Sequence, residues 1–258
     1  MRAIKKSVSK LVTAAAFAAS IAVTAPASAA VIQLGFIVDS SGSLGTAGWN
    51  LIRTGLSNAI NNLIPVGGTD TYEVSVVSFS NTAVINVNHV LINSVAARTG
   101  VAGTVASMTF LNSTTNFAAG FTAMNSALTS SPNYSAGLAQ YVNFSTDGIQ
   151  NVGGTGIPER NALLASGINN ISIEGIGAAV DAADLTNNFC SPQPCDTTIP
   201  FNFPAQGFYL AVANPAAYEA AISTKIRIVT GQVPEPATLA LLGVALAGLG
   251  FSRRRKLL

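Results

Sequence analysis

Two patterns of apolar and polar positions alternate along this chain and predict its secondary structure. Short runs of β-branched and large apolar residues, each bounded by small polar residues, are typical of buried strands. Between these runs, apolar residues recur every three or four positions, as on one face of a helix. The strand pattern covers residues 31–38, 72–79, 138–146, 171–177 and 208–212, and an alternating stretch at 82–90 predicts an edge strand.

The helical pattern covers residues 49–63, 117–128, 161–168 and 215–229. Strands that alternate with helices predict an α/β fold, a doubly wound, mostly parallel sheet flanked by helices, in which ligands bind beyond the carboxyl ends of the strands. Residues 90–108 are expected to form a short helix and loops interrupted by Gly100 and Gly103. Residues 181–204 are expected to form an irregular insertion.

Polar side chains with metal-binding chemistry follow the first strand. Asp39, Ser41 and Ser43 stand at alternate positions, and Gly42 lets the backbone turn between the serines. Hard oxygen ligands on a short loop suit Mg²⁺, Mn²⁺ or Ca²⁺ better than zinc. The alternative is an Asp/Ser turn that hydrogen-bonds its own backbone. Further along, Thr115 precedes a helix, where a hydroxyl is often an N-cap, and Asp147 ends a strand.

Three segments around these residues, FIVDSSGS, TTNFAAGF and VNFSTDG, resemble the metal loops of the von Willebrand factor type A domain. The resemblance extends over about residues 31–230 and implies that family's Rossmann-like fold and metal-ion-dependent adhesion site. It implies that Ser41 and Ser43 bind the metal directly, that Thr115 binds it directly or through water in one state, and that Asp39 and Asp147 hold its waters. Mg²⁺ is the expected ion, with Mn²⁺ or Ca²⁺ as alternatives, and an open position would accept a carboxylate from a partner.

Composition and charge exclude one class of partner. Only 9% of the 258 residues are charged, and eight of the 13 basic residues lie within the first ten residues or at 253–256. The remaining five stand against all 11 acidic residues, so the central part has a net negative charge and lacks the basic footprint of a nucleic-acid-binding protein.

Both ends of the chain carry sorting features. Residues 1–29 have a basic start, an apolar run at 11–23 that covers every helical face, and the small residues Ala27-Ser28-Ala29, as in a secretory signal peptide. Residues 236–252 lack charge and precede the basic run 253–256, which fits a short transmembrane helix or a buried helix. With Val233-Pro234-Glu235-Pro236 in front, this end resembles the PEP-CTERM sorting signal.

The sorting resemblance implies a domain plan and a destination. We expect a signal peptide at 1–29, a type A domain at 30–232 and a sorting signal at 233–258 with a short transmembrane helix and basic tail. It implies that exosortase removes the tail from a transiently membrane-anchored precursor, and that the protein reaches the envelope, outer surface or extracellular matrix of a Gram-negative bacterium. In such an exported chain Cys190 and Cys195 are expected to form a disulfide, with a redox or metal role as the alternative.

The catalytic motifs of common enzyme classes are missing. His89 is the single histidine and lies on the predicted edge strand, and the sequence has no G-x-S-x-G, phosphate-binding loop or HExxH motif. We therefore expect a non-enzyme, an adhesion module that binds a protein or polysaccharide carboxylate through a divalent cation. The alternatives are a structural matrix protein whose metal site only stabilises the fold, and a secreted metal-assisted hydrolase.

Overall fold

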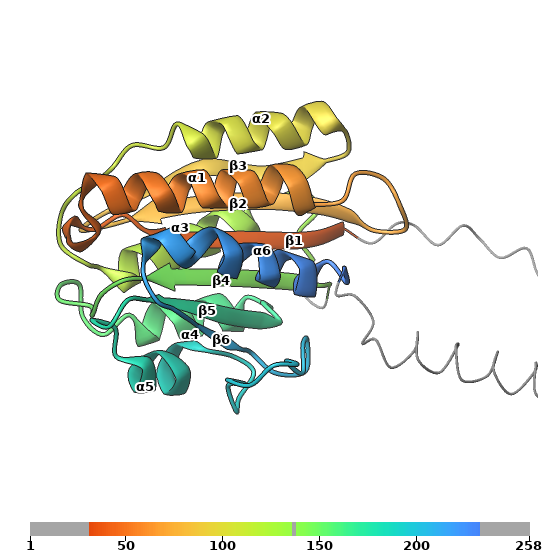
Figure 1. Cartoon of the computed structure of the whole chain (residues 1–258). Coiled ribbons are helices and arrows are strands. Elements are labelled where there is room, and N and C mark those ends of the chain that lie inside the picture. The colour runs from red at the N-terminus through yellow and green to blue at the C-terminus, as the bar shows by residue number, and fades with distance from the viewer. Residues whose placement is uncertain (1–30, 136–137, 233–258) are drawn as a thin grey trace, which may run out of the picture.

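The computed structural model describes residues 31–135 and 138–232 as a six-stranded sheet covered by helices on both faces (Figure 1). The strands are β1 (Val31–Asp39), β2 (Thr71–Phe79), β3 (Ala83–Ile92), β4 (Gln140–Thr146), β5 (Asn170–Ile176) and β6 (Tyr209–Val212). They lie in the order β3-β2-β1-β4-β5-β6, and all neighbours are parallel except β3, which pairs antiparallel with β2 at the edge. The doubly wound, mostly parallel sheet predicted from the sequence is therefore confirmed.

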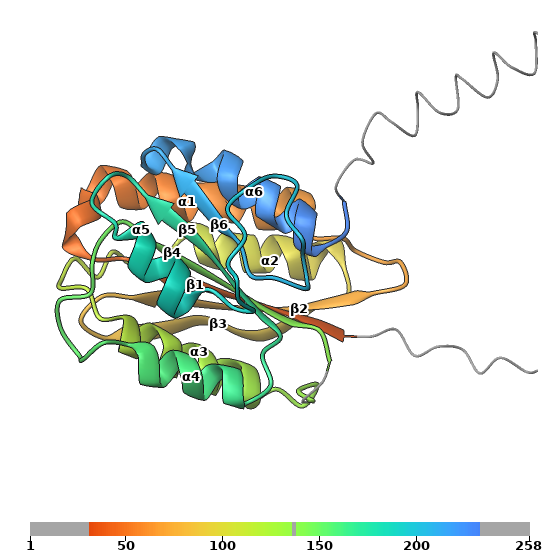
Figure 2. The ribbon, with the colours of Figure 1, turned by 90° about the horizontal axis from the view of Figure 1, so that it is seen from below.

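The helices form two layers, which Figure 2 shows on opposite sides of the sheet. They are α1 (Gly45–Leu63), α2 (Val95–Ala106), α3 (Phe117–Thr129), α4 (Ile157–Ala165), the single turn α5 (Ala182–Asp184) and α6 (Tyr218–Val229). Helices α1, α2 and α6 cover one face, and α3 and α4 cover the other. Successive side chains of β1 pack against opposite layers: Phe36 packs with the first group of helices and Ile37 with the second.

Helix α2 differs from the expectation for residues 90–108. It runs without interruption over the twelve residues Val95–Ala106, through Gly100 and Gly103. Ser94 caps it, because its side chain accepts a hydrogen bond from the amide of Ala97. Both glycines lie on an open surface with no atom within 4 Å of a Cβ built on them. The apolar face of Val101 and Val105, packed against α1 and the sheet, therefore decides the conformation, and the glycines only weaken the helix.

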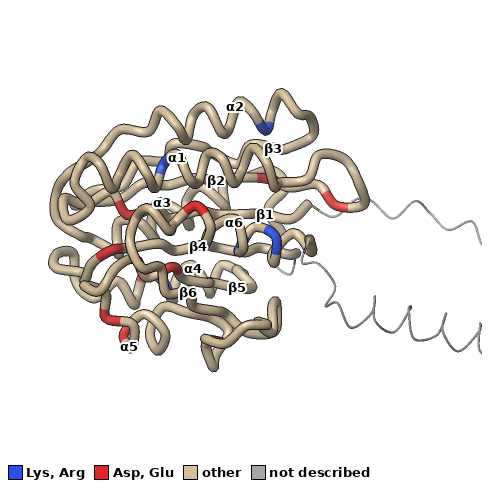
Figure 3. The backbone as a smooth tube through the Cα atoms, viewed as in Figure 1, with Lys and Arg blue, Asp and Glu red and all other residues tan. Residues whose placement is uncertain are grey.

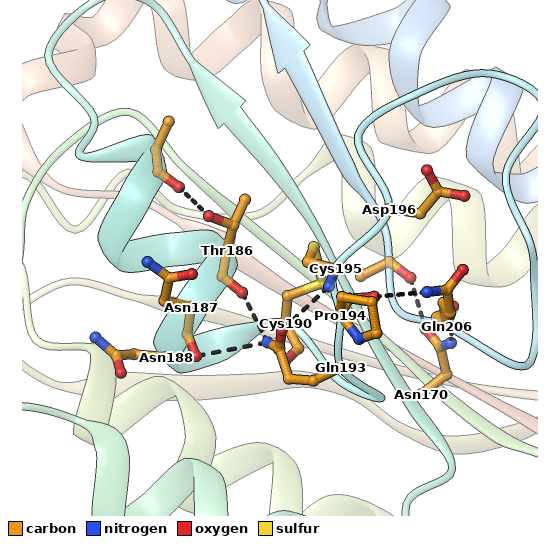
Figure 4. Close-up of a disulfide and its surroundings, with 12 residues drawn as sticks. Asn170, Thr186, Asn187, Asn188, Cys190, Gln193, Pro194, Cys195, Asp196 and Gln206 are labelled. Carbon is orange, nitrogen blue, oxygen red and sulfur yellow. Dashed lines mark hydrogen bonds between the residues drawn. A yellow bond between two sulfur atoms is a disulfide. The ribbon is translucent and has the colours of Figure 1, made fainter.

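The cysteine-bearing insertion is less irregular than expected. Its first part continues α5 with a wide helical turn, Leu185–Phe189, which buries both named residues in the core beside α3 and α4. Cys190 and Cys195 are bonded directly after it, and Figure 4 shows the pair held next to Gln193, whose side chain donates to the carbonyl oxygen of Cys190 at 2.8 Å. The insertion thus completes the core under β5 and β6.

The two described ends of the domain lie at the same side of the molecule, opposite the carboxyl ends of the parallel strands (Figure 1). Val31 begins β1 there, and Gln232 follows α6, its side chain donating to the carbonyl oxygen of Leu63 at 2.6 Å. The predicted signal peptide and sorting signal lie outside the described residues. Within residues 31–135 and 138–232, no helix is both long and apolar enough to cross a membrane.

Candidate metal centre

The sheet brings the predicted site residues to one place. Strand order reverses at the neighbours β1 and β4, and Asp39 ends β1 where Thr146 ends β4. A crevice forms at such a switch point because the chains leaving the two strands turn to opposite faces of the sheet. Ser41 and Ser43 follow β1, Asp147 follows β4, and the loop before α3 brings Thr115 to the same edge.

Asp39 is the buried anchor of the site, with 1% of its surface exposed. Its Oδ1 accepts a hydrogen bond from the amide of Ser41 at 2.8 Å, and its Oδ2 accepts one from the hydroxyl of Thr146 at 2.6 Å. Burial raises the pKa of Asp39 to about 6, and the nearby Asp147 adds to the rise. The carboxylate is thus held in a fixed orientation by two donors, yet its charge is poorly compensated.

The two serines and Asp147 form a continuous chain of polar contacts. The hydroxyl oxygens of Ser41 and Ser43 are 3.1 Å apart, and the hydroxyl of Ser43 donates to Oδ1 of Asp147 at 2.8 Å. Burial also raises the pKa of Asp147 above its usual value, although the hydrogen bond from Ser43 opposes the rise. Two carboxylates therefore share a small region in which each would gain from a neighbouring positive charge.

Thr115 faces the same region. The expectation that it caps α3 is wrong. The cap is Asn116, whose side chain accepts from the amide of Ala119 at 3.2 Å. Thr115 is 4% exposed, and a Cβ built on Gly148 would lie 3.8 Å from both its hydroxyl oxygen and that of Ser43. Because the side-chain oxygen of Asn116 caps the helix, the Thr115 hydroxyl is left to line the groove.

Three residues that support the site were missed in the sequence. Thr146 orients Asp39, as described above. The side chain of Ser40 accepts from the amide of Leu111 at 2.9 Å, and that of Ser80, directly after β2, donates to the carbonyl oxygen of Thr114 at 2.9 Å. These bonds fix the loop that carries Thr115. The available signal was position: each is a hydroxyl at or next to the end of a central strand.

The site opens into a groove of about 420 Å³. Its lining carries hydroxyls, amides and one exposed apolar side chain, and comprises Ser43, Asn112, Ser113, Thr114, Thr115, Gly148, Ile149 and Asn151. Acidic positions gather toward this end of the molecule and basic ones are sparse (Figure 3). In residues 31–135 and 138–232, no three His, Cys, Asp or Glu side chains cluster, so any metal held here would depend on hydroxyl ligands.

The side chains present fit a hard divalent cation. Three hydroxyl oxygens and two carboxylates offer only oxygen, the donor atom that Mg²⁺, Mn²⁺ and Ca²⁺ prefer. The raised pKa values of Asp39 and Asp147 indicate unmet demand for positive charge. The donor set and its electrostatics therefore agree with each other.

Comparison with known families assigns both parts of the chain. The family model of the von Willebrand factor type A domain matches residues 33–206, and that of the PEP-CTERM protein-sorting motif matches residues 232–256. Among curated proteins, none is similar enough to match.

Several solved structures share the fold. Proximal thread matrix protein 1 from the mussel byssus is 16% identical with a TM-score of 0.59, over 78% of this chain and 47% of that one. Pilus adhesin SpaC from Lactobacillus rhamnosus GG is 15% identical with a TM-score of 0.57, over 78% and 31%. A type A protein from Catenulispora acidiphila is 14% identical with a TM-score of 0.57, over 78% and 43%.

These structural similarities concern one part of each of the three proteins. This chain spans less than half the length of each of the three proteins, and at such identities the likeness shows the fold alone. One structure of the mussel protein is described as having a zinc-occupied MIDAS motif, the metal-ion-dependent adhesion site.

Proposed function

Because the chain belongs to the von Willebrand factor type A family, we propose that it is an exported module that attaches to its partner through a divalent cation. The cation would be held by Asp39, Ser41, Ser43, Thr115 and Asp147. The observation that carries this proposal is the meeting of these residues, from three separate segments, at the switch point of the sheet. The relative with zinc in its adhesion site supports the choice of a divalent ion.

Each residue has a distinct part in the proposed site. Ser41 and Ser43 contact the ion through their hydroxyls, and Thr115 contacts it directly or through water. Asp39 and Asp147 accept hydrogen bonds from the ion's water ligands and supply negative charge. Neutral hydroxyls leave the cation incompletely neutralised, so a bound Mg²⁺ would offer an open position to an outside carboxylate. Mn²⁺ and Ca²⁺ are the alternative ions.

The surroundings favour a ligand that carries a carboxylate. The N-terminus of the thirteen-residue helix α3 begins beside Thr115 and contributes a partial positive charge. The groove is open, and the hydroxyl and amide groups along it can hydrogen-bond a protein or polysaccharide chain. A carboxylate on either kind of partner would complete the shell of the cation.

The sorting signal supports a destination outside the cytoplasm. The PEP-CTERM match at residues 232–256 points to an exported protein of the Gram-negative envelope that exosortase processes. We propose that residues 1–29 are the signal peptide, residues 30–232 the type A domain, and residues 233–258 the part recognised by exosortase and briefly anchored in the membrane. The structural neighbours include a pilus adhesin and a thread matrix protein of the mussel byssus, which supports this placement.

A structural role in an extracellular matrix is the second candidate. The buried Asp39, with its raised pKa, favours it, because a cation there would stabilise the fold even without a ligand. Catalysis has less support: His89, the single histidine, lies on the edge strand β3, whereas the groove lies at the ends of β1 and β4.

An attachment assay separates these functions. Purified protein should bind the producing bacterium's polysaccharide or surface proteins with Mg²⁺ and lose this binding with EDTA or on Asp147→Ala, while circular dichroism stays native. Asp70→Ala, which removes an exposed carboxylate, is the matched control and should bind normally. Attachment that ignores EDTA would contradict adhesion; if EDTA lowers only the melting temperature, the matrix role is supported. Mg²⁺-dependent release of product from a substrate panel would instead reveal a hydrolase.

A further inference from the structure

The only lysine between residues 11 and 255 is buried. Lys225 lies on α6 with 2% of its surface exposed. Its Nζ is 3.0 Å from Oε1 of Glu174 on β5, donates to Oδ1 of Asn143 on β4, and lies 5.2 Å from the ring centre of Phe208. An amine, a carboxamide and a carboxyl group from three elements thus meet in the interior.

This cluster is poorly satisfied as a set of non-covalent contacts. Glu174 is fully buried and Asn143 is 5% exposed, yet neither oxygen of Glu174 nor the Nδ2 of Asn143 has a well-directed hydrogen bond. Buried ion pairs stabilise a fold only when their remaining polar atoms are paired, because desolvation otherwise outweighs the attraction. A stabilising ion pair between Lys225 and Glu174 therefore does not explain this arrangement.

The protonation tendencies of the cluster suit a reaction. Burial lowers the pKa of Lys225 to about 8, and burial also raises the pKa of Glu174 despite the neighbouring lysine. Both shifts favour a neutral amine beside a carboxylic acid, the state that remains when Lys225 passes a proton to Glu174. Tyr218, the other titratable group here, has its pKa raised by burial and by Glu174, so it stays neutral.

We propose that Lys225 and Asn143 become joined by an amide bond between the lysine Nζ and the asparagine Cγ, with Glu174 carrying the protons. The neutral amine attacks Cγ, and protonated Glu174 stabilises the oxygen that develops negative charge. Glu174 then delivers its proton to Nδ2 and, as the carboxylate that this leaves, accepts the proton that departs from Nζ. The Cγ–Nδ2 bond breaks, ammonia departs, Glu174 is again protonated, and no oxidant or other reactant is needed.

The surroundings allow these steps. Strand pairing places Asn143 opposite Ser172 and Glu174 opposite Ser145, so both reacting partners of Lys225 face α6 from adjacent strands. A cavity of about 20 Å³, lined in part by Asn143, Ser172 and Lys225, has room for one small molecule such as the released ammonia. Holding the groups together in a dry site replaces the high concentration that amide formation otherwise requires.

The bond would join a central strand to the last helix. Asn143 and Lys225 are 82 residues apart, and a link between them would close a loop that contains β5, the insertion and β6. Neither the adhesion proposal nor the metal centre is needed for this inference, since the cluster contains none of the five metal-site residues.

Intact mass tests the bond on the folded, purified protein. After allowance for the disulfide, the measured mass should lie about 17 Da, the mass of the one ammonia that is lost, below the mass calculated from the sequence. Tandem mass spectrometry should find the peptides of Asn143 and Lys225 joined. With the proposed ends at 30 and 232, Lys225 is the sole side-chain amine, so an amine reagent applied after unfolding should label only the α-amino group. A full mass with a labelled Lys225 would overturn the proposal.

Two variants assign the roles. Glu174→Gln retains both reacting side chains but cannot carry the proton, so it should show the full mass and a reactive lysine. Arg227→Met, an exposed change two residues along the same helix, should keep the mass deficit. If Glu174→Gln also keeps the deficit, the role of Glu174 is wrong. If it fails to fold, the mass and labelling of the unaltered protein still decide whether the bond exists.

Discussion

The hydroxyl of Ser43 donates a hydrogen bond of 2.8 Å to Oδ1 of Asp147, which lies 104 residues later in the chain. This contact joins the loop after β1 to the loop after β4 and depends on the two strands being neighbours. It also leaves Asp147 as an acceptor that a hydrated cation could share. Ser43 is therefore both a proposed ligand and the link between two halves of the site.

Removal of Asp39 should abolish cation binding. Its carboxylate is the only buried charge at the site with two fixed donors, and Asp39→Ala would remove both the charge and the partner of Thr146. Isothermal titration calorimetry with Mg²⁺ or Mn²⁺ should show one site in the unaltered protein and none in the variant. Asp70→Ala should bind as the unaltered protein does; equal binding by all three proteins would refute the assignment.

Metal-free protein should lose stability as the pH rises through about 6. Asp39 has a raised pKa, so the folded chain holds a proton that the unfolded chain releases near pH 3.8. Its stabilising contribution is complete below that lower value and declines above it, by about 3 kcal/mol in total. Urea unfolding in EDTA should show this decline, saturating Mg²⁺ should offset it, and Asp39→Asn should reduce it. An unchanged pH dependence in Asp39→Asn would contradict the shifted pKa.

The same substitution at two helical glycines should have opposite effects. A Cβ on Gly120 of α3 would lie 3.0 Å from Ile37 and 3.1 Å from Phe79, whereas one on Gly100 of α2 would meet nothing within 4 Å. Gly120→Ala should cost about 1–3 kcal/mol through overpacking. Gly100→Ala should gain up to about 1 kcal/mol from helix propensity. Urea unfolding measures both, and a gain at Gly120 would show that the helix can move away from the sheet.

Reduction of the disulfide should lower the free energy of unfolding only modestly. Cys190 and Cys195 are five residues apart, and closing so short a loop restricts the unfolded chain by only about 2 kcal/mol. Cys190→Ala with Cys195→Ala should lower the free energy of unfolding by about that amount. A thiol assay on unfolded, unreduced protein should detect no free thiol; two thiols per chain would exclude the bond in the native protein.

Processing should remove both sorting segments. Protein isolated from its native host should begin near residue 30 and end near Pro234, because the signal peptide and the PEP-CTERM tail are cleavage signals. Intact mass of the native protein measures both ends. Retention of Arg253–Leu258 would argue against exosortase handling, and a host strain that lacks exosortase provides the matched control.

The sequence predicted the elements that carry a strong pattern and failed where packing decides. The strand that ends at Asp39 and the strand that ends just before Asp147 were predicted because each is an apolar run followed closely by a carboxylate. Helix α2 was underestimated because Gly100 and Gly103 weaken the local signal, whereas contacts with α1 and the sheet hold the helix. The buried Phe189 was missed because it lies among the polar residues of the insertion, and only the gap beside α3 and α4 explains its place.

Within the site, the sequence reveals which types of residue are present but not which side chains contact one another. Asp39, Ser41 and Ser43 stand close together in the sequence, so their chemistry was visible at once. That Thr146 binds Asp39 depends on the pairing of β1 with β4, a non-local fact that no short motif contains. The buried cluster of Asn143, Glu174 and Lys225 is of the same kind, since its members come from three distant segments.

The placement of the described ends determines how the molecule would carry a mechanical load. Val31 and Gln232 lie at one side, and the groove lies at the other, beyond the strand ends. A chain held beyond Gln232 and pulled through the groove would be stretched along the strands, with the tension entering the sheet through α6. Contacts between α6 and the sheet would then resist peeling, and Lys225 lies within that path. A covalent link at this position would keep α6 attached to the sheet under tension.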